Sequence, residues 1–167
     1  MTRIKQIKKI FYRFMPNEQF LHSDLTQGII GTFFEVYNEL GHGFLESVYE
    51  KSLAIALRAK GLEVHQQIAV PVWFRGAQVG DFTADLLINR LVLLELKVVK
   101  NIDQAHIAQL LNYLKATQIE VGLVLNFGAK PEFKRLAFSN DRKSAEPGRE
   151  LSDFLSASSV SSAVKTA

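Results

Sequence analysis

The sequence predicts an α/β domain in which helices flank a mixed central β-sheet. Apolar residues follow a helical period up to about residue 60 and an alternating period from 64 onwards, and a further helical stretch separates the third expected strand from the fourth. The 167 residues fit one domain, which we place at 21–138, between a basic extension at 1–20 and a polar tail at 139–167. We expect the serine-rich tail to be disordered.

Composition excludes several classes of protein. A content of 47% hydrophobic and 22% charged residues argues against a disordered chain. The sequence has no cysteine, which excludes disulfides, thiolate zinc sites and cysteine nucleophiles. It has no apolar run of about 18 residues and no secretory signal pattern, so we expect a cytoplasmic protein.

The net charge of +3 is unevenly distributed. Residues 1–13 carry five basic residues and no acidic one, so 15 basic and 17 acidic residues remain in the rest of the chain. Nucleic-acid binding would therefore have to rest on a local site. The basic segment fits either a docked extension or an amphipathic helix that contacts a membrane or nucleic acid, unless Met15 is the true start. Its apolar residues at helical spacing are Ile4, Ile7, Phe11 and Phe14.

Two helices are expected at the start of the domain. Ser23 and Asp24 are candidate N-cap residues for a first helix that runs to Leu40, where Gly41-His42-Gly43 ends it. A second helix is expected at about 45–60, before Gly61.

Three strands then form an antiparallel meander. The expected strands are 64–70, 78–88 and 91–99, with turns at 75–76 and 89–90. Pro71 suits a strand end or a sheet edge because proline cannot donate a ladder hydrogen bond.

The last part of the domain adds a helix and a buried strand. Asp103 is the expected cap of a helix at about 103–116, and the apolar stretch 120–127 is typical of a strand buried on both faces. The helix permits a crossover, so this strand and the third one can pair in parallel. Residues 132–138 are expected to be extended, and Leu151, Phe154 and Leu155 suit a short docked helix.

Two neighbouring strands carry the residues that indicate chemistry. Asp85 lies within the otherwise apolar run 84–88, and Glu95 and Lys97 are two apart, so these two share a face. A loop made of 89–91 pairs Asp85 with Glu95, whereas a two-residue loop would pair Asp85 with Leu94 and separate the acids. The alternative for Glu95 and Lys97 is an exposed strand end with a weak ion pair.

Two adjacent carboxylates repel each other unless one is protonated or a cation lies between them. Carboxylate oxygens suit Mg²⁺, with Mn²⁺ as a substitute. A lysine beside such an ion can orient or deprotonate water, or neutralise a phosphate. These parts are sufficient for metal-assisted phosphodiester hydrolysis.

Two helices bring further polar residues near this pair. Glu46 opens the second helix, where it also complements the helix dipole. Gln109 and Tyr113 lie four apart on the third helix, with His106 nearby on the same face. Without a site, Gln109 and Tyr113 would be ordinary boundary residues of an amphipathic helix.

These motifs, taken together, resemble the GxxExxY proteins of the PD-(D/E)XK nuclease superfamily. The resemblance covers residues 22–138 and rests on Gly43-x-x-Glu46-x-x-Tyr49, Asp85, Glu95-Leu96-Lys97 and Gln109-x-x-x-Tyr113, in that order. It implies a restriction-endonuclease-like α-β-β-β-α-β core.

The resemblance also implies roles for individual residues. Asp85, Glu95, the Leu96 carbonyl and Glu46 would be metal ligands, and Lys97 would position water or the scissile phosphate. Gln109 would support the site, and Tyr113 would pack or contact substrate. None of these positions is lost in this chain.

The resulting expectation is a Mg²⁺-dependent nuclease whose substrate is DNA, with RNA as the alternative. The few basic residues that could hold phosphates include Lys100 and Lys115, together with Lys130, Lys134 and Arg135. One alternative is a non-catalytic module on the same fold that binds nucleic acid or protein. Another is a structural partner that contacts a larger assembly through 1–20. The sequence does not set the oligomeric state, and a homodimer is among the states it allows.

A serine hydrolase has little support, because none of the four histidines accompanies a Gly-x-Ser-x-Gly elbow.

Overall fold

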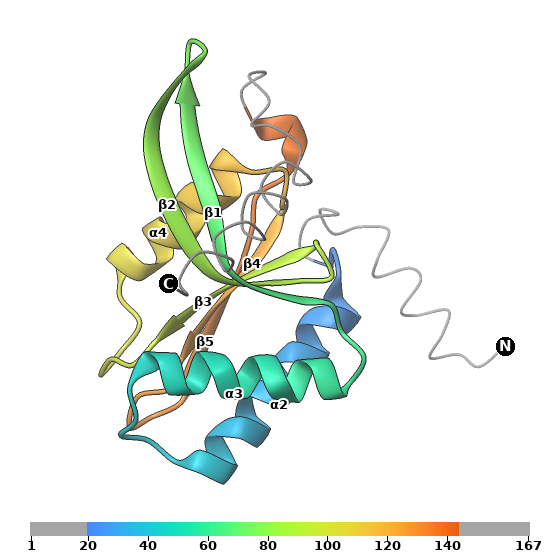
Figure 1. The fold of residues 1–167 in the computed structure, drawn as a ribbon, viewed down its shortest axis with the longest axis vertical. Helices are drawn as coiled ribbons and strands as arrows, with labels where there is room; N and C mark the ends of the chain where they lie inside the picture. The colour runs from blue at the N-terminus through green and yellow to red at the C-terminus, as the bar shows by residue number, and fades with distance from the viewer. Residues whose placement is uncertain (1–19, 144–167) are drawn as a thin grey trace, which may run out of the picture.

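The computed structural model describes residues 20–143, and its centre is a five-stranded sheet with the strand order β1-β2-β3-β4-β5 (Figure 1). The helices are α2 (Ser23–Leu40), α3 (Glu46–Ala59) and α4 (Gln104–Ala116). The strands are β1 (Val64–Phe74), β2 (Ala77–Ile88), β3 (Val92–Lys97), β4 (Val121–Asn126) and β5 (Glu132–Ala137).

The strand pairing confirms the mixed α/β sheet. β1, β2 and β3 form the expected antiparallel meander, β3 and β4 are parallel, and β4 and β5 are antiparallel. α4 makes the crossover between the two parallel strands, as parallel neighbours require a long connection. The flanking helices and this strand order give the restriction-endonuclease-like core that was expected.

A separate apolar core fills each face of the sheet. On one face, α2 and α3 contribute side chains such as Phe33 and Tyr49, which pack with Phe127. On the other face, Leu110 and Leu114 of α4 pack against strand residues such as Val124. Complete burial of a leucine or phenylalanine stabilises the fold by about 1.5–3 kcal/mol, so the two cores hold the helices in register with the sheet.

The helix caps follow the sequence in one case and not in another. Asp103 caps α4 as expected, because its carboxylate accepts hydrogen bonds from the backbone nitrogens of Ala105 and His106. The expected cap at Ser23 and Asp24 is wrong. α2 begins at Ser23 itself, and the residue before it, His22, has a left-handed backbone and makes no side-chain cap.

The first hairpin is longer than expected. β1 continues past Pro71 to Phe74, which is possible because β1 is the edge strand of the sheet. β2 pairs with β3 only at Leu86, Leu87 and Ile88, so the rest of the hairpin projects beyond the sheet as a two-stranded arm (Figure 1).

The end of the domain also differs from the expected boundary. Asn140–Arg142 form a turn of 3₁₀ helix within the stretch assigned to the tail. The backbone nitrogen of Asn140 donates to Glu120 at 2.7 Å, and this contact holds the turn to the domain. The expected helix in 1–20, the alternative start at Met15 and the docked helix near Leu151 lie outside the described residues. Within residues 20–143, no helix combines the length and apolar character that crossing a bilayer requires.

Candidate active site

The β2–β3 loop has the length that brings the two acids together. Ile88 pairs with Val92, and the loop between them contains three residues, of which Asn89 and Arg90 have left-handed backbones. The last ladder pair before the acids is Leu86 with Leu94, so Asp85 and Glu95 are the next opposed positions. The three-residue alternative is confirmed and the two-residue alternative is wrong.

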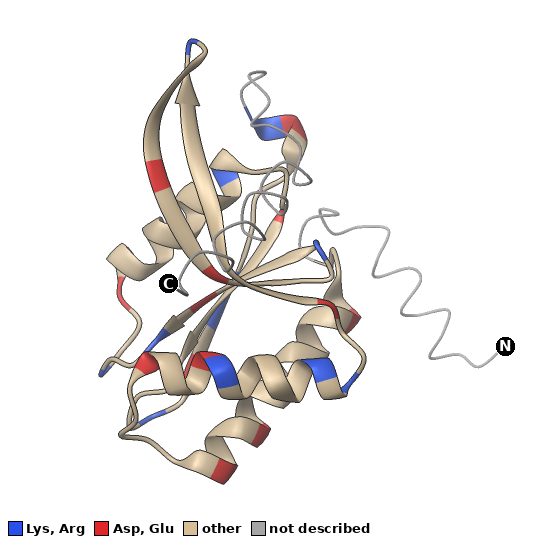
Figure 2. Ribbon diagram, viewed as in Figure 1, with Lys and Arg blue, Asp and Glu red and all other residues tan. Residues whose placement is uncertain are grey.

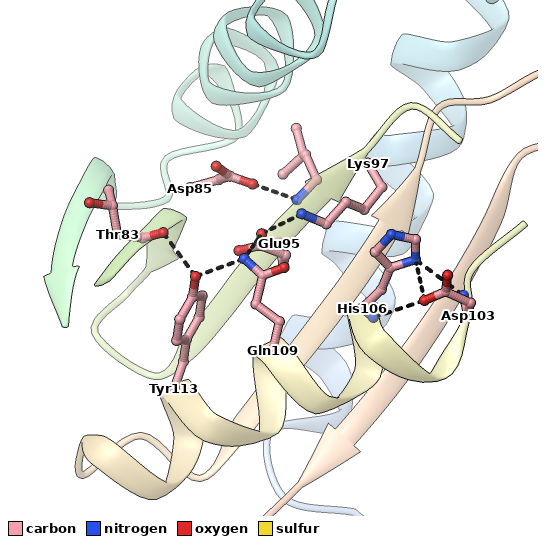
Figure 3. Close-up of polar contacts among 9 residues, drawn as sticks. Thr83, Asp85, Glu95, Lys97, Asp103, His106, Gln109 and Tyr113 are labelled. Atoms are coloured by element: carbon pink, nitrogen blue, oxygen red, sulfur yellow. Dashed lines mark hydrogen bonds and ion pairs between the residues drawn. The ribbon is translucent and has the colours of Figure 1, made fainter. Parts of the chain in front are cut away.

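Asp85 uses its side chain where the ladder between β2 and β3 stops. Its Oδ2 accepts a hydrogen bond of 2.6 Å from the backbone nitrogen of Leu96 (Figure 3). The pKa of Asp85 is raised to about 6, mainly by burial and also by the charges of Glu46 and Glu50, although the Leu96 hydrogen bond lowers it. The fold therefore disfavours the ionised form of Asp85, and a bound cation would stabilise that form.

Glu95 is buried, with 3% of its surface exposed, so the alternative of an exposed strand end is wrong. Its Oε1 accepts hydrogen bonds from Lys97 at 2.8 Å and from Gln109 at 2.7 Å. Its Oε2 is buried and has no hydrogen-bond partner among residues 20–143. The pKa of Glu95 is raised to about 7, mainly by burial and also by the charge of Asp85, while Lys97 lowers it.

Lys97 is held as a cation beside the two acids. Its side chain is 16% exposed and its Nζ donates to Glu95. Burial alone would lower the pKa of Lys97, but the hydrogen bond and charge of Glu95, with the charges of Glu46 and Asp85, outweigh it and raise the pKa above its ordinary value. Lys97 therefore remains an ammonium group at neutral pH, which suits it to hold an anion rather than to accept a proton.

Gln109 and Tyr113 connect α4 to the site. The amide nitrogen of Gln109 donates to Glu95 and, at 2.8 Å, to the Tyr113 hydroxyl, which in turn donates to the Thr83 carbonyl (Figure 3). Tyr113 is buried in the α4 core, so it is more than a boundary residue. This series of hydrogen bonds fixes the position of the Gln109 amide relative to the Glu95 carboxylate.

Glu46 stands at the start of α3 and is exposed. The loop before it is shaped by Gly41 and Gly43, which both have positive φ angles, and by Tyr49. The Tyr49 hydroxyl donates to the Gly41 carbonyl at 2.7 Å and accepts from the backbone nitrogen of Phe44 at 3.3 Å. Tyr49 therefore positions the loop that presents Glu46, a role that the sequence analysis did not assign.

Other expected residues lie outside this hydrogen-bonded group. Lys100 is exposed on the loop that follows β3. Lys115 lies over the ring of Phe138, 5.7 Å from its centroid, near the opposite end of α4 from Asp103. His106 completes the cap of α4 by accepting from the backbone nitrogen of Asp103.

Asn126 was missed by the sequence analysis, although an asparagine in an apolar strand was a signal. Its side chain accepts from the nitrogen of Val99 at 3.0 Å and donates to the carbonyl of Val99 at 2.9 Å. A Cβ atom at Gly128 would overlap that same carbonyl oxygen, so the glycine permits the close approach. Together they fasten the loop that follows Lys97.

The donor set fits a hard divalent cation that keeps several of its waters. No group of three or more His, Cys, Asp or Glu side chains suited to a metal occurs in the described part of the chain. Mg²⁺ is commonly bound by one or two carboxylates with water completing its shell. The unpartnered Oε2 of Glu95 and the mutual repulsion of Asp85 and Glu95 are what a bound cation would relieve.

Among residues 20–143, the charges around the site do not form a basic face. Figure 2 shows Lys and Arg distributed over separate elements and interspersed with Asp and Glu. Contacts with a polyanion would therefore have to be few and local.

Comparison with known proteins identifies the family. A model of the PD-(D/E)XK nuclease superfamily matches residues 23–136, which is more than half of the chain and includes the whole site. The chain belongs to this superfamily.

Two further comparisons concern individual proteins. None of the curated proteins matches it. The solved structure titled "Crystal structure of SSO0001" is similar at a TM-score of 0.45 and 17% identity. That alignment covers 74% of this chain and 62% of the other, so this chain spans less than two thirds of that protein.

Proposed function

We propose that this protein is a Mg²⁺-dependent nuclease of the GxxExxY group that hydrolyses phosphodiester bonds in DNA. One observation supports this proposal most directly. Buried Glu95 presents an unpartnered oxygen beside a second carboxylate, Asp85, and next to a protonated lysine, Lys97. An acidic pair next to a fixed cation reduces the stability of the fold. Binding of a metal and a phosphate by these groups would account for that cost.

Asp85, Glu95 and the backbone carbonyl of Leu96 would hold the ion, with Glu46 as a further carboxylate that acts through water. When bound, Mg²⁺ would polarise the scissile phosphate and lower the pKa of a water molecule. Mn²⁺ would substitute for it because both ions prefer oxygen ligands.

The chain's own side chains bind and orient the substrate. Lys97 donates from its ammonium group to a phosphate oxygen or to the attacking water, and Glu95 fixes the direction of that ammonium at 2.8 Å. Gln109 holds the same oxygen of Glu95 from the opposite element, and Tyr113 holds Gln109. Preorganisation of this kind avoids reorganisation during the reaction. Lys100 and Lys115 would contact phosphates farther along the strand.

The test is cleavage of double-stranded DNA, single-stranded DNA and RNA of one sequence by the full chain, with Mg²⁺, with Mn²⁺ and with chelator. We expect cleavage of DNA only with metal, and a loss of about 100-fold or more in Asp85→Ala, Glu95→Ala and Lys97→Ala. Asp81→Ala is the matched control, because Asp81 is an exposed acid of the same strand.

Two outcomes would contradict the proposal. Equal cleavage by the three variants and the parent would show that another site or a contaminant is responsible. Binding that is insensitive to chelator, without turnover under any metal, would support the non-catalytic module instead.

A further inference from the structure

β1 has one residue with a backbone that strands rarely contain. Gln67 has a φ of 54° within β1, in the left-handed region that residues with a Cβ avoid. The register places it opposite Asp85, because Gln66 pairs with Leu86 and Ile68 pairs with Ala84. A strained residue therefore faces the first acid of the proposed site.

In both β1 and β2, the side chains change from one face of the sheet to the other near Gln67 and Asp85. In a regular strand, alternate residues share a face. In β1, however, Val64 packs in the core under α2 and α3, whereas Ile68 packs in the core under α4. In β2, Leu86 belongs to the first core and Ala84 to the second. The change of face falls on Gln67 in one strand and on Asp85 in the other.

This exchange explains why Asp85 reaches sideways to β3. A residue at the point of exchange packs in neither core. The Asp85 carboxylate instead accepts a hydrogen bond of 2.6 Å from the Leu96 N–H. The ladder between β2 and β3 ends one pair earlier, at Leu86 and Leu94, which leaves that N–H available.

A carboxylate of α3 holds the irregular part of β1. Glu50 accepts hydrogen bonds from two consecutive side chains, Gln66 at 3.1 Å and Gln67 at 2.8 Å. Consecutive side chains of a regular strand point to opposite faces, so one acceptor can bind both only because of the left-handed backbone at Gln67. Arg58, also on α3, donates to the Gln66 side chain and to the Val64 carbonyl, which fixes the segment further.

We infer that Glu50 and Gln67 are positioning residues: their contact holds β1 in the conformation that aims the Asp85 carboxylate at β3. The effect of this contact on catalysis rests on the proposed function, but its effect on the position of Asp85 does not. Neither residue has to touch the substrate or the metal.

The test follows the Leu96 amide in the ¹⁵N-labelled full chain with chelator present, since this amide reports its hydrogen bond to Asp85. The variants are Gln67→Val, Gln67→Gly and Glu50→Ala, and Asp85→Ala defines the signal of the broken bond. Valine and glycine both remove the amide contact, but only glycine tolerates a positive φ. Arg75→Val is the matched control, because Arg75 also has a positive φ, of 49°, at the tip of the arm.

We expect Gln67→Val and Glu50→Ala to move the Leu96 resonance towards its position in Asp85→Ala and to speed its hydrogen exchange. Gln67→Gly should stay closer to the parent than Gln67→Val, and Arg75→Val should leave the amide unchanged. In the cleavage assay with Mg²⁺, kcat should fall about tenfold or more in Gln67→Val and Glu50→Ala, with KM little changed.

A parental Leu96 amide in both Gln67→Val and Glu50→Ala would overturn the inference. If Gln67→Val does not fold, Glu50→Ala decides the question alone, because alanine is compatible with its helical position. If the parent chain cleaves nothing, the proposed nuclease function fails, while the amide measurement still supports or overturns the positioning role.

Discussion

Replacing Asp85 by asparagine should make the metal-free protein more stable. Asparagine keeps an oxygen that can accept the Leu96 N–H, but it removes the negative charge of the half-buried Asp85. The pKa of Asp85 rises from 3.8 to about 6 on folding, so its ionised form opposes folding at neutral pH. At about 1.4 kcal/mol per pKa unit, this corresponds to roughly 3 kcal/mol.

Partial solvent contact and the desolvation of the new amide reduce this figure, and we expect a gain of about 1–2 kcal/mol in the free energy of unfolding at pH 8. For a chain of this size, the gain should raise Tm by about 2–8 °C. The measurement is urea and thermal denaturation in chelator. Asp81→Asn is the control, since it removes an exposed acid from the same strand and should change little.

The pH dependence provides a second check on the same reasoning. The folded parent binds more protons than the unfolded chain between pH 3.8 and about 6 at Asp85, and between 4.5 and about 7 at Glu95. Its stability should therefore fall as pH rises through these windows. The advantage of Asp85→Asn should be absent near pH 4 and complete by about pH 8. Adding Mg²⁺ should stabilise the parent but not the variant. An Asp85→Asn protein that is less stable than the parent at pH 8 would refute the argument.

Three further substitutions test the surroundings of the site. Gln109→Ala should lower kcat about 10–100-fold while leaving weaker metal binding in place, because Gln109 orients Glu95 without being a metal ligand; activity and calorimetric titration with Mn²⁺ check this. Gly128→Ala should destabilise the fold by about 1–3 kcal/mol in urea denaturation, since its Cβ would overlap the carbonyl of Val99. Asp103→Ala should cost about 1 kcal/mol by the same measurement, because two backbone N–H groups at the start of α4 lose their acceptor.

The sequence predicted the elements well where apolar periodicity was strong. α3, α4 and β4 lie within about a residue of their expected ranges, and the parallel pairing of β3 and β4 followed from the crossover helix. The three-residue loop at 89–91 was predictable only as one of two alternatives. The pairing of Ile88 with Val92 decides between them, and this register is visible only in the folded sheet.

The sequence could suggest which residues form the candidate site, but not how deeply they are buried or which hydrogen bonds they make. Spacing could indicate that Glu95 and Lys97 share a face, yet the burial of Glu95 and its hydrogen bond from Gln109 depend on α4, which is distant in sequence. Gln67 carried no signal at all, because glutamine in an alternating strand is ordinary, and its strain arises from the exchange of faces in the folded sheet.

The crossover between β3 and β4 also has a consequence for the order in which the protein is made. Gln109 of α4 donates to Glu95, and the core that holds α4 on the sheet includes Val124 of β4. A ribosome-bound chain that ends before Val121 contains both acids and Gln109, but it lacks the Val124 side chain of β4 that packs against α4. Strand pairing between segments distant in sequence, such as β3 and β4, forms slowly. An unfinished polypeptide therefore carries the two acids before the complete sheet supports them.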